Sequence, residues 1–194
     1  MARISVHTPN VLFRNYNFSI ILFFHYDQIY SVEQIKLTKI YMTSKLTIRK
    51  ASINDIPILV NNNQALARET ENIQLHRETI LAGVSNSLKR EDCHYFVAEL
   101  NGEVVGQTMI TYEWSDWRNG VMWWIQSVYV QAEHRKKGVF RSLFKHIEHL
   151  AKNNSDVKAL RLYVMGNNVS GKNTYKTLGM QDSGYIVYEK ENIN

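Results

Sequence analysis

A basic turn that contains a glycine is the part of the sequence whose residue types and spacing most clearly suggest chemistry. It follows an apolar, β-branched and aromatic run over residues 121–130, which is typical of a buried strand. Three cations and a glycine are then adjacent, Arg135, Lys136, Lys137 and Gly138, and apolar residues at helical spacing begin directly after them. The free N–H groups of a first helical turn attract anions, and glycine lets a phosphate approach the backbone closely. The segment therefore predicts a phosphate site, although the cations taken alone would also suit a solvated turn.

Two segments resemble the sequence motifs of a known enzyme family. Residues 135–140 (RKKGVF) resemble the R/Q-x-x-G-x-G/A signature of the GNAT acetyltransferase superfamily, with Phe140 in place of the last small residue. Residues 168–180 resemble the family's N-x-x-A-x-x-x-Y-x-x-x-G-F segment, with Gly171 for alanine and Met180 for phenylalanine. The two motifs stand in the family's order and are separated by the expected strand.

The resemblance implies a fold class and a cosubstrate. The fold would be mixed α/β, with a mostly antiparallel central sheet that splays between its fourth and fifth strands and is flanked by helices. Acetyl-CoA would bind in that opening, where a strand N–H near Val128 would stabilise the oxyanion of the thioester carbonyl. Asn168 would hold the cofactor arm from the other strand. The backbone that pairs with pantetheine would be that of Val128, Tyr129 and Val130, and the pyrophosphate would be held by Arg135, Lys136, Lys137, Gly138, Val139 and Phe140.

The resemblance also implies direct transfer of the acetyl group to a primary amine, which makes the protein an N-acetyltransferase. Tyr175 would protonate the departing CoA thiolate, because a phenol with a pKa of about 10 suits a thiol with a pKa of about 8.5. The alternative for Tyr175 is a core tyrosine whose ring only packs. Many relatives carry a glutamate on the fourth strand, but Gln126 and Ser127 occupy that region here. We therefore expect Glu113 to be the general base, with Asp116 as the next candidate, and either could instead be a loop carboxylate that faces solvent.

The acceptor is less clearly indicated by the sequence than the cosubstrate. The turn between the third and fourth strands gathers indole rings and acids, namely Glu113, Trp114, Asp116 and Trp117. Such a group could hold a cationic amine by cation–π contacts and ion pairing. Trp123 and Trp124 are expected to be core residues instead, because two adjacent tryptophans on a central strand face opposite layers. A small amine, an amino acid and a peptide N-terminus all remain candidate acceptors.

The elements that must position these residues can be placed from periodicity and turn signals. Asn101-Gly102 is a strong hairpin signal. The expected strands are 46–50, 95–100, 104–114, 121–130, 159–164 and 185–189, and the expected helices are 55–71, 76–89, one that begins after Gly138, and 169–178. Hairpins in the middle and β-α-β crossovers later in the chain favour a mixed sheet covered by helices.

The sequence predicts a boundary between residues 43 and 44. Residues 44–194 should form one acetyltransferase domain, and residues 1–43 an N-terminal extension of uncertain order. Met42 precedes the first clean strand and would make a sensible alternative start. We expect no catalytic duty for the extension.

Composition limits the classes of partner. A formal net charge of +5 and a pI of about 9.2 are compatible with a phosphate-bearing cofactor. The single cysteine excludes an internal disulfide and fits a cytoplasmic protein. We expect no metal site, because His146 and His149 are three residues apart, a spacing typical of the solvent-exposed face of an amphipathic helix. No P-loop or nucleic-acid motif occurs, and the apolar run 18–24 is far shorter than the roughly 18 residues that span a membrane. A homodimer is compatible with these features.

A second class of function remains open. A non-catalytic module that binds or senses acyl-CoA would keep the basic turn but would lack a working acid and base. The missing strand glutamate and the bulky Phe140 are the features that favour it. Acetyl-CoA-dependent turnover of an amine would distinguish the enzyme from this alternative.

Overall fold

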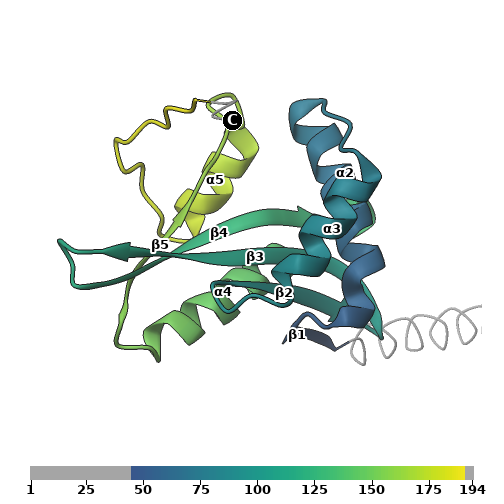
Figure 1. The fold of residues 1–194 in the computed structure, drawn as a ribbon, viewed down its shortest axis with the longest axis horizontal. Coiled ribbons are helices and arrows are strands. Elements are labelled where there is room, and N and C mark those ends of the chain that lie inside the picture. The colour runs from purple at the N-terminus through teal and green to yellow at the C-terminus, as the bar shows by residue number, and fades with distance from the viewer. Residues whose placement is uncertain (1–44, 191–194) are drawn as a thin grey trace, which may run out of the picture. The chain divides into compact units, whose positions relative to one another are not determined.

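A five-stranded sheet forms the centre of the fold (Figure 1). The structure is a computed structural model and describes residues 45–190. The strands lie in the order β1-β2-β3-β4-β5, in which β1 to β4 pair antiparallel and β5 pairs parallel to β4. Their bounds are β1 Leu46–Lys50, β2 Cys93–Leu100, β3 Glu103–Ser115, β4 Gly120–Val130 and β5 Val157–Leu162. The sheet is mixed, mostly antiparallel and open, which confirms the predicted fold class.

Within the described residues, four α-helices surround this sheet. Helix α4 packs on one face, and α2 and α3 pack on the other (Figure 1). The bounds are α2 Ile56–Glu71, α3 Arg77–Ser87, α4 Val139–Lys152 and α5 Val169–Thr177. Because β4 and β5 are parallel, the chain needs a crossover between them, and α4 supplies it.

The alternation of side chains along the strands builds one core on each face of the sheet. Phe96 packs with the α4 residue Leu143, which is completely buried, whereas its neighbours Tyr95 and Val97 pack with Leu59 of α2. Burial of each large apolar side chain contributes about 1.5–3 kcal/mol. The two cores therefore fix α4 on one face of the sheet and α2 and α3 on the other.

The hairpin between β2 and β3 forms where the sequence predicts it. Asn101 and Gly102 have φ angles of +53° and +87°, so both occupy the left-handed region. A two-residue turn with this backbone matches the twist of the strands it joins, and asparagine followed by glycine adopts it at little cost. This turn sets the register of β2 against β3.

The last predicted strand, residues 185–189, does not form. Residues 181–190 have no regular secondary structure, and the side chains from Tyr185 to Tyr188 are between 69% and 88% exposed. The strand propensity of this segment is high, but a strand also needs a partner edge. In the described part of the chain the sheet ends at β5, and the segment does not pair with it.

Two further expectations concern the ends of the chain and the membrane. No helix in residues 45–190 is long and apolar enough to cross a bilayer. The proposed extension 1–43, with Met42 and the apolar run 18–24, lies outside the described residues.

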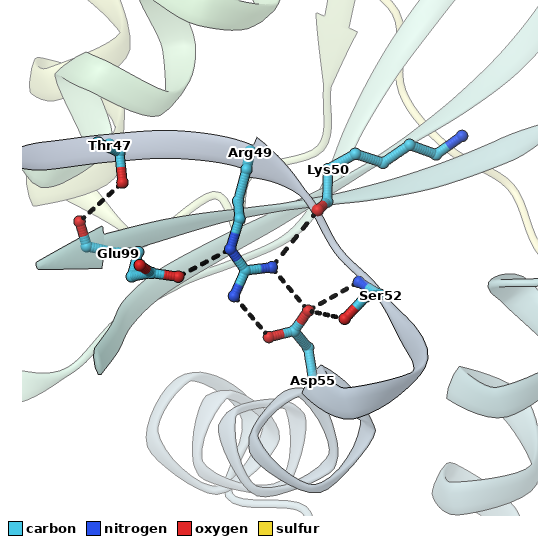
Figure 2. A network of polar contacts seen from close by, with 6 residues as sticks. All are labelled: Thr47, Arg49, Lys50, Ser52, Asp55 and Glu99. Atoms are coloured by element: carbon cyan, nitrogen blue, oxygen red, sulfur yellow. Dashed lines mark hydrogen bonds and ion pairs between the residues drawn. The ribbon is translucent and has the colours of Figure 1, made fainter. Parts of the chain in front are cut away.

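A partly buried ion pair ties β1 to the start of α2 (Figure 2). Arg49 donates two hydrogen bonds to the Asp55 carboxylate, at 2.8 and 2.9 Å, and a third to Glu99 at 2.8 Å. The backbone N–H of Ser52 donates to the same Asp55 carboxylate at 2.7 Å. The hydrogen bonds from Arg49 lower the pKa of Asp55 from 3.8 to about 2, against the opposing effect of its burial.

Replacing Asp55 by asparagine should destabilise the protein at neutral pH and should matter less in acid. The folded-state pKa of Asp55 lies below its unfolded value, so its contribution of about 2 kcal/mol is fully present above pH 3.8 and is lost as the pH falls towards 2. Urea unfolding at pH 7 and pH 3 would measure the free energy of unfolding of wild type and of Asp55→Asn. The difference between the two proteins should be smaller at pH 3 than at pH 7. Asp92→Asn, which removes an exposed ion pair with Arg90, is the control and should hardly move the midpoint. An equal difference in the free energy of unfolding at both pH values would contradict this account.

Candidate active site

The pairing between β4 and β5 stops before β4 ends. Its last partners are Ile125 and Leu162, whereas β4 continues to Val130. Along residues 126–130 the edge of β4 that faces the β5 side therefore has no strand partner among the described residues. Backbone N–H and C=O groups on such an edge can pair with an extended ligand. The three residues predicted to contact pantetheine, Val128, Tyr129 and Val130, all lie on this stretch.

A β-bulge sits where the unpaired edge begins. Gln126 pairs with Met109 and Tyr129 pairs with Gln107, so Ser127 and Val128 together oppose one residue of β3. Ser127 has a φ angle of +48°, a left-handed conformation that is uncommon for a residue with a side chain. The bulge turns the β4 backbone at the position where the resemblance places the reacting carbonyl.

Two buried side chains of β3 hold the bulge. The Thr108 hydroxyl donates to the Gln126 carbonyl at 3.1 Å, and the Gln107 amide donates to the Ser127 carbonyl at 3.4 Å. Gln107 is 0% exposed and Thr108 is 1% exposed. These bonds satisfy carbonyls that the disrupted ladder leaves without regular partners. Sequence reasoning missed both residues, because a polar residue inside an otherwise apolar strand was the sole signal.

The basic turn ends in the N-terminus of α4, as predicted. Gly138 is the N-cap with a φ angle of +82°, and Lys136 is also left-handed with a φ angle of +61°. No side chain caps the helix, and the first intrahelical bond runs from the Ser142 N–H to the Gly138 carbonyl. The N–H groups of the first turn are therefore free to bind an anion. A Cβ built on Gly138 would meet nothing within 4 Å, so the space around this backbone is open.

Arg135 is positioned by contacts that the sequence did not reveal. Its guanidinium donates to the Glu69 carboxylate at 2.6 Å and to the Val130 carbonyl at 2.8 Å, and it lies 5.3 Å from the centre of the Tyr129 ring. The Tyr129 hydroxyl donates to the other oxygen of Glu69 at 2.9 Å. Desolvation alone would raise the pKa of Glu69, but the hydrogen bonds from Arg135 and Tyr129 outweigh it and lower that pKa. Part of the Arg135 charge is thus compensated, whereas Lys136 and Lys137 are exposed.

The second motif forms a capped helix next to the turn. Asn168 is the N-cap of α5, and its side-chain oxygen accepts a hydrogen bond from the Gly171 N–H at 2.8 Å. A Cβ at Gly171 would lie 2.8–3.0 Å from the Asn168 side chain, so glycine leaves room for this side chain at the cap. The amide N–H₂ of Asn168 is not used by the cap, and it is the group that could still donate to a ligand.

Tyr175 and Phe140 bring the two motifs into contact. Their rings meet edge to face, with centroids 5.8 Å apart and planes at 75°. Tyr175 is half-buried, and desolvation raises the pKa of its phenol above the usual 10. The phenol therefore stays protonated at neutral pH, as a proton donor must. The phenylalanine that departs from the signature thus packs against the predicted acid.

Glu113 is an exposed residue near the end of β3 that contacts polar side chains of β4 and β5. Its carboxylate accepts a hydrogen bond from the Trp124 indole at 2.5 Å and another from Arg161 at 3.3 Å. Trp124 stacks on Tyr163 with centroids 4.4 Å apart. Trp123 is 9% exposed in the core under α4, as predicted. Trp124 faces the opposite layer but is only half-buried, so the prediction that it is a core residue was wrong.

The other titratable candidates lie apart from this group of side chains. Asp116 is exposed at the tip of the β3–β4 hairpin, where it accepts a hydrogen bond from the Trp117 backbone N–H at 2.9 Å. His146 packs against Phe96, and His149 lies 3.0 Å from the Asn153 side chain. Across residues 45–190, no group of three or more histidine, cysteine, aspartate or glutamate side chains is placed to hold a metal ion.

The sequence and the fold of this chain are similar to those of known acetyltransferases. Residues 59–180 match the Acetyltransferase (GNAT) family. A possible acetyltransferase from Clostridium difficile 630 is 41% identical with a TM-score of 0.73, over 77% of this chain and 99% of that one. A predicted acetyltransferase with acetyl-CoA from Clostridium acetobutylicum (20% identity, TM-score 0.63, 75% of this chain and 96% of that one) shares the fold. An aminoglycoside N-acetyltransferase in complex with CoA also shares the fold, with 13% identity and a TM-score of 0.62 over 76% of this chain and 95% of that one.

No match was found among curated protein sequences. The family match nevertheless spans more than half of the chain, and the similar structure from Clostridium difficile is well above 30% identical. The open β4 edge, the uncapped helix behind the basic turn and the Asn168–Tyr175 motif occur inside that matched region. The chain belongs to the GNAT acetyltransferase family.

Proposed function

We propose that the protein is an N-acetyltransferase that transfers the acetyl group of acetyl-CoA to a primary amine. The observation that carries this proposal is the unpaired edge of β4, which begins at a bulge and leads directly to an uncapped helix N-terminus. A thioester with a pantetheine arm and a pyrophosphate matches these features in that order. Structures of the same fold with acetyl-CoA or with CoA support the choice of cosubstrate.

The residues present fit this cosubstrate chemically. The backbone of Val128, Tyr129 and Val130 would pair with the pantetheine amides. The pyrophosphate would accept hydrogen bonds from the first turn of α4, while exposed cations compensate its charge. The cations and N–H groups concerned are those of Arg135, Lys136, Lys137, Gly138, Val139 and Phe140, and the amide of Asn168 would bind from the side of α5.

The proposed reaction is a direct attack of a neutral amine on the thioester carbonyl. A C–N bond forms, the C–S bond breaks, and the electron pair leaves with the sulfur of CoA. The Val128 N–H would donate to the carbonyl oxygen, on which negative charge develops. Tyr175 would give its proton to the sulfur, and a base would take the proton lost by the amine. Most of the acceleration would come from holding the two reactants together.

Glu113 is our proposed base, and its present hydrogen bonds limit how it can take a proton. The carboxylate already accepts hydrogen bonds from Trp124 and Arg161, so it must accept the amine proton through water or release the 3.3 Å contact with Arg161. Both carboxylates are exposed, and Asp116 is the weaker candidate because it lies in the turn beyond the last β3–β4 pair, Ser115 and Gly120.

Replacing Glu113 by glutamine should lower kcat by about 100-fold if this carboxylate takes the proton. Glutamine keeps an oxygen for the Trp124 indole, so the variant separates loss of the base from loss of that contact. Initial rates of CoA release across pH 6–10 would measure the effect. Asp116→Asn tests the weaker candidate in parallel and should keep wild-type rates if Glu113 is the base. Wild-type kcat in Glu113→Gln would assign the carboxylate to holding Trp124 and Arg161.

The proposal as a whole is tested by calorimetry of acetyl-CoA binding to the full chain, followed by CoA release with a panel of amines. Micromolar binding together with amine-dependent release is the expected result. Binding without release from any amine would favour the non-catalytic acyl-CoA-binding module. Absence of binding would refute the placement of acetyl-CoA on β4.

A further inference from the structure

A cavity of about 480 Å³ lies on the α2 and α3 side of the sheet, next to the bulge. Its lining comes from α2, α3, β2, β3 and β4, and it includes Asn63, Ile80, Gly83, Met109, Thr111 and Ser127. Ser127 is the left-handed residue of the bulge, where the unpaired edge of β4 begins. The cavity therefore opens beside the position proposed for the thioester, on the face away from α4. Its volume lies in the usual range for small-molecule sites.

The lining of the cavity is mixed in polarity but almost uncharged. The apolar part comes from side chains such as Ile80 and Met109, and the polar part from hydroxyl and amide groups such as Thr111 and Asn63. Asn63 is 5% exposed and is fixed by a hydrogen bond of 3.1 Å to the Tyr95 hydroxyl. Such walls can bury apolar atoms of a ligand and hydrogen-bond to neutral polar groups.

The charged groups at the cavity are already paired. Of the lining residues, Arg90 and Asp92 alone carry full charges, and they form an ion pair with each other. Two carboxylates of the candidate site that do not line the cavity are also engaged, Glu69 by Arg135 and Glu113 by Arg161. No carboxylate among the described residues that line the cavity is left unpaired, so a cation inside it would lose hydration without a free counter-charge from this lining, which is unfavourable.

We infer that the acceptor is a primary monoamine with an uncharged body, which binds in this cavity with its amino group towards Ser127. The inference rests on the proposed acetyl transfer and adds the substrate class to it. The amine loses its own charge before it attacks, so the cavity needs no carboxylate for it. Polyamines and aminoglycosides, whose further cations stay charged, should be poor substrates.

Gly83 offers a direct test, because it lines the cavity from α3. A Cβ built there meets nothing within 4 Å, and the residue lies inside the helix, where alanine or leucine suits the backbone better than glycine. Gly83→Ala and Gly83→Leu should therefore fold at least as well as wild type while filling part of the cavity. Ala82→Leu is the matched control, since Ala82 is exposed on the same helix and does not line the cavity.

The experiment measures CoA release by the full chain with phenethylamine and hexylamine, and with spermidine and kanamycin for comparison. We expect kcat/KM to be at least about tenfold higher for the monoamines. Gly83→Leu should raise the KM for phenethylamine by about tenfold, Gly83→Ala by less, and neither should change the KM for acetyl-CoA. Ala82→Leu should match wild type throughout.

The outcomes separate this inference from the proposed function. Preference for spermidine or kanamycin, or acetyl-CoA binding without turnover of either monoamine, would overturn the acceptor class and leave acetyl-CoA binding intact. An unchanged KM for phenethylamine in Gly83→Leu would overturn the assignment of the cavity. Failure of wild type to bind acetyl-CoA in calorimetry would overturn the proposed function and this inference together.

Discussion

Replacing Tyr175 by phenylalanine should lower kcat about 100-fold and leave the KM for acetyl-CoA nearly unchanged. The ring, with its edge-to-face contact to Phe140, is retained, so the variant removes the hydroxyl alone. Without that proton donor the sulfur must leave as a thiolate, and general acid catalysis is commonly worth 10²–10⁴ in rate. Steady-state CoA release at saturating amine and acetyl-CoA is the measurement. Tyr188→Phe, at a tyrosine that is 88% exposed, is the control.

The pH dependence of kcat adds an independent check on Tyr175. Desolvation raises the pKa of this phenol above 10, and a raised pKa means that the acid form persists further into the alkaline range. Activity that depends on protonated Tyr175 should therefore fall above pH 10 and not between pH 7 and 9. A Tyr175→Phe enzyme with wild-type kcat would remove the residue from the mechanism and leave it a packing role beside Phe140.

Replacing Gly138 by aspartate should weaken acetyl-CoA binding by at least about 100-fold. The carboxylate would lie at the N-cap of α4, among the N–H groups proposed to hold the pyrophosphate. It would neutralise the positive potential of these groups and repel the phosphates. Calorimetry of acetyl-CoA with the purified variant measures the loss directly.

Gly138→Asn is the matched control for this variant. Asparagine and aspartate have nearly the same size, and both pay a similar cost for the left-handed backbone at a φ angle of +82°. The two variants therefore differ chiefly in charge, and the asparagine variant should bind much more tightly than the aspartate one. Equal affinity in both would show that the pyrophosphate lies elsewhere, and circular dichroism of both would verify that α4 is intact.

The parts of the site that depend on neighbouring residues were predictable from the sequence. The apolar spacing after Gly138 defines α4, and the Asn101-Gly102 turn defines the β2–β3 hairpin, because both are set by interactions over a few residues. The position of the basic turn between β4 and α4 follows from the same local pattern. Local propensity alone also predicted a strand at 185–189, and there it failed for lack of a partner edge.

The contacts that shape the site needed the tertiary structure. Glu69 and Arg135 are 66 residues apart, and no local pattern indicates that they form an ion pair. The bulge at Ser127 arises from how β4 pairs with β3, and a serine carries no sequence signal for a left-handed backbone. The partners of Glu113 come from β4 and β5, so the sequence could nominate it as a base without showing that Trp124 and Arg161 already bind it.

The sequence by itself thus indicated the order of the elements from β1 to α5, the family and the segment proposed to bind the phosphates, since short-range periodicity, turn chemistry and local motifs encode them. Only the tertiary structure decided where β4 parts from β5, how Tyr175 meets Phe140, and which charges at the α2 and α3 face are already paired. These features depend on the register of strands and the packing of helices far apart in the chain, and such long-range choices are made by the whole core together.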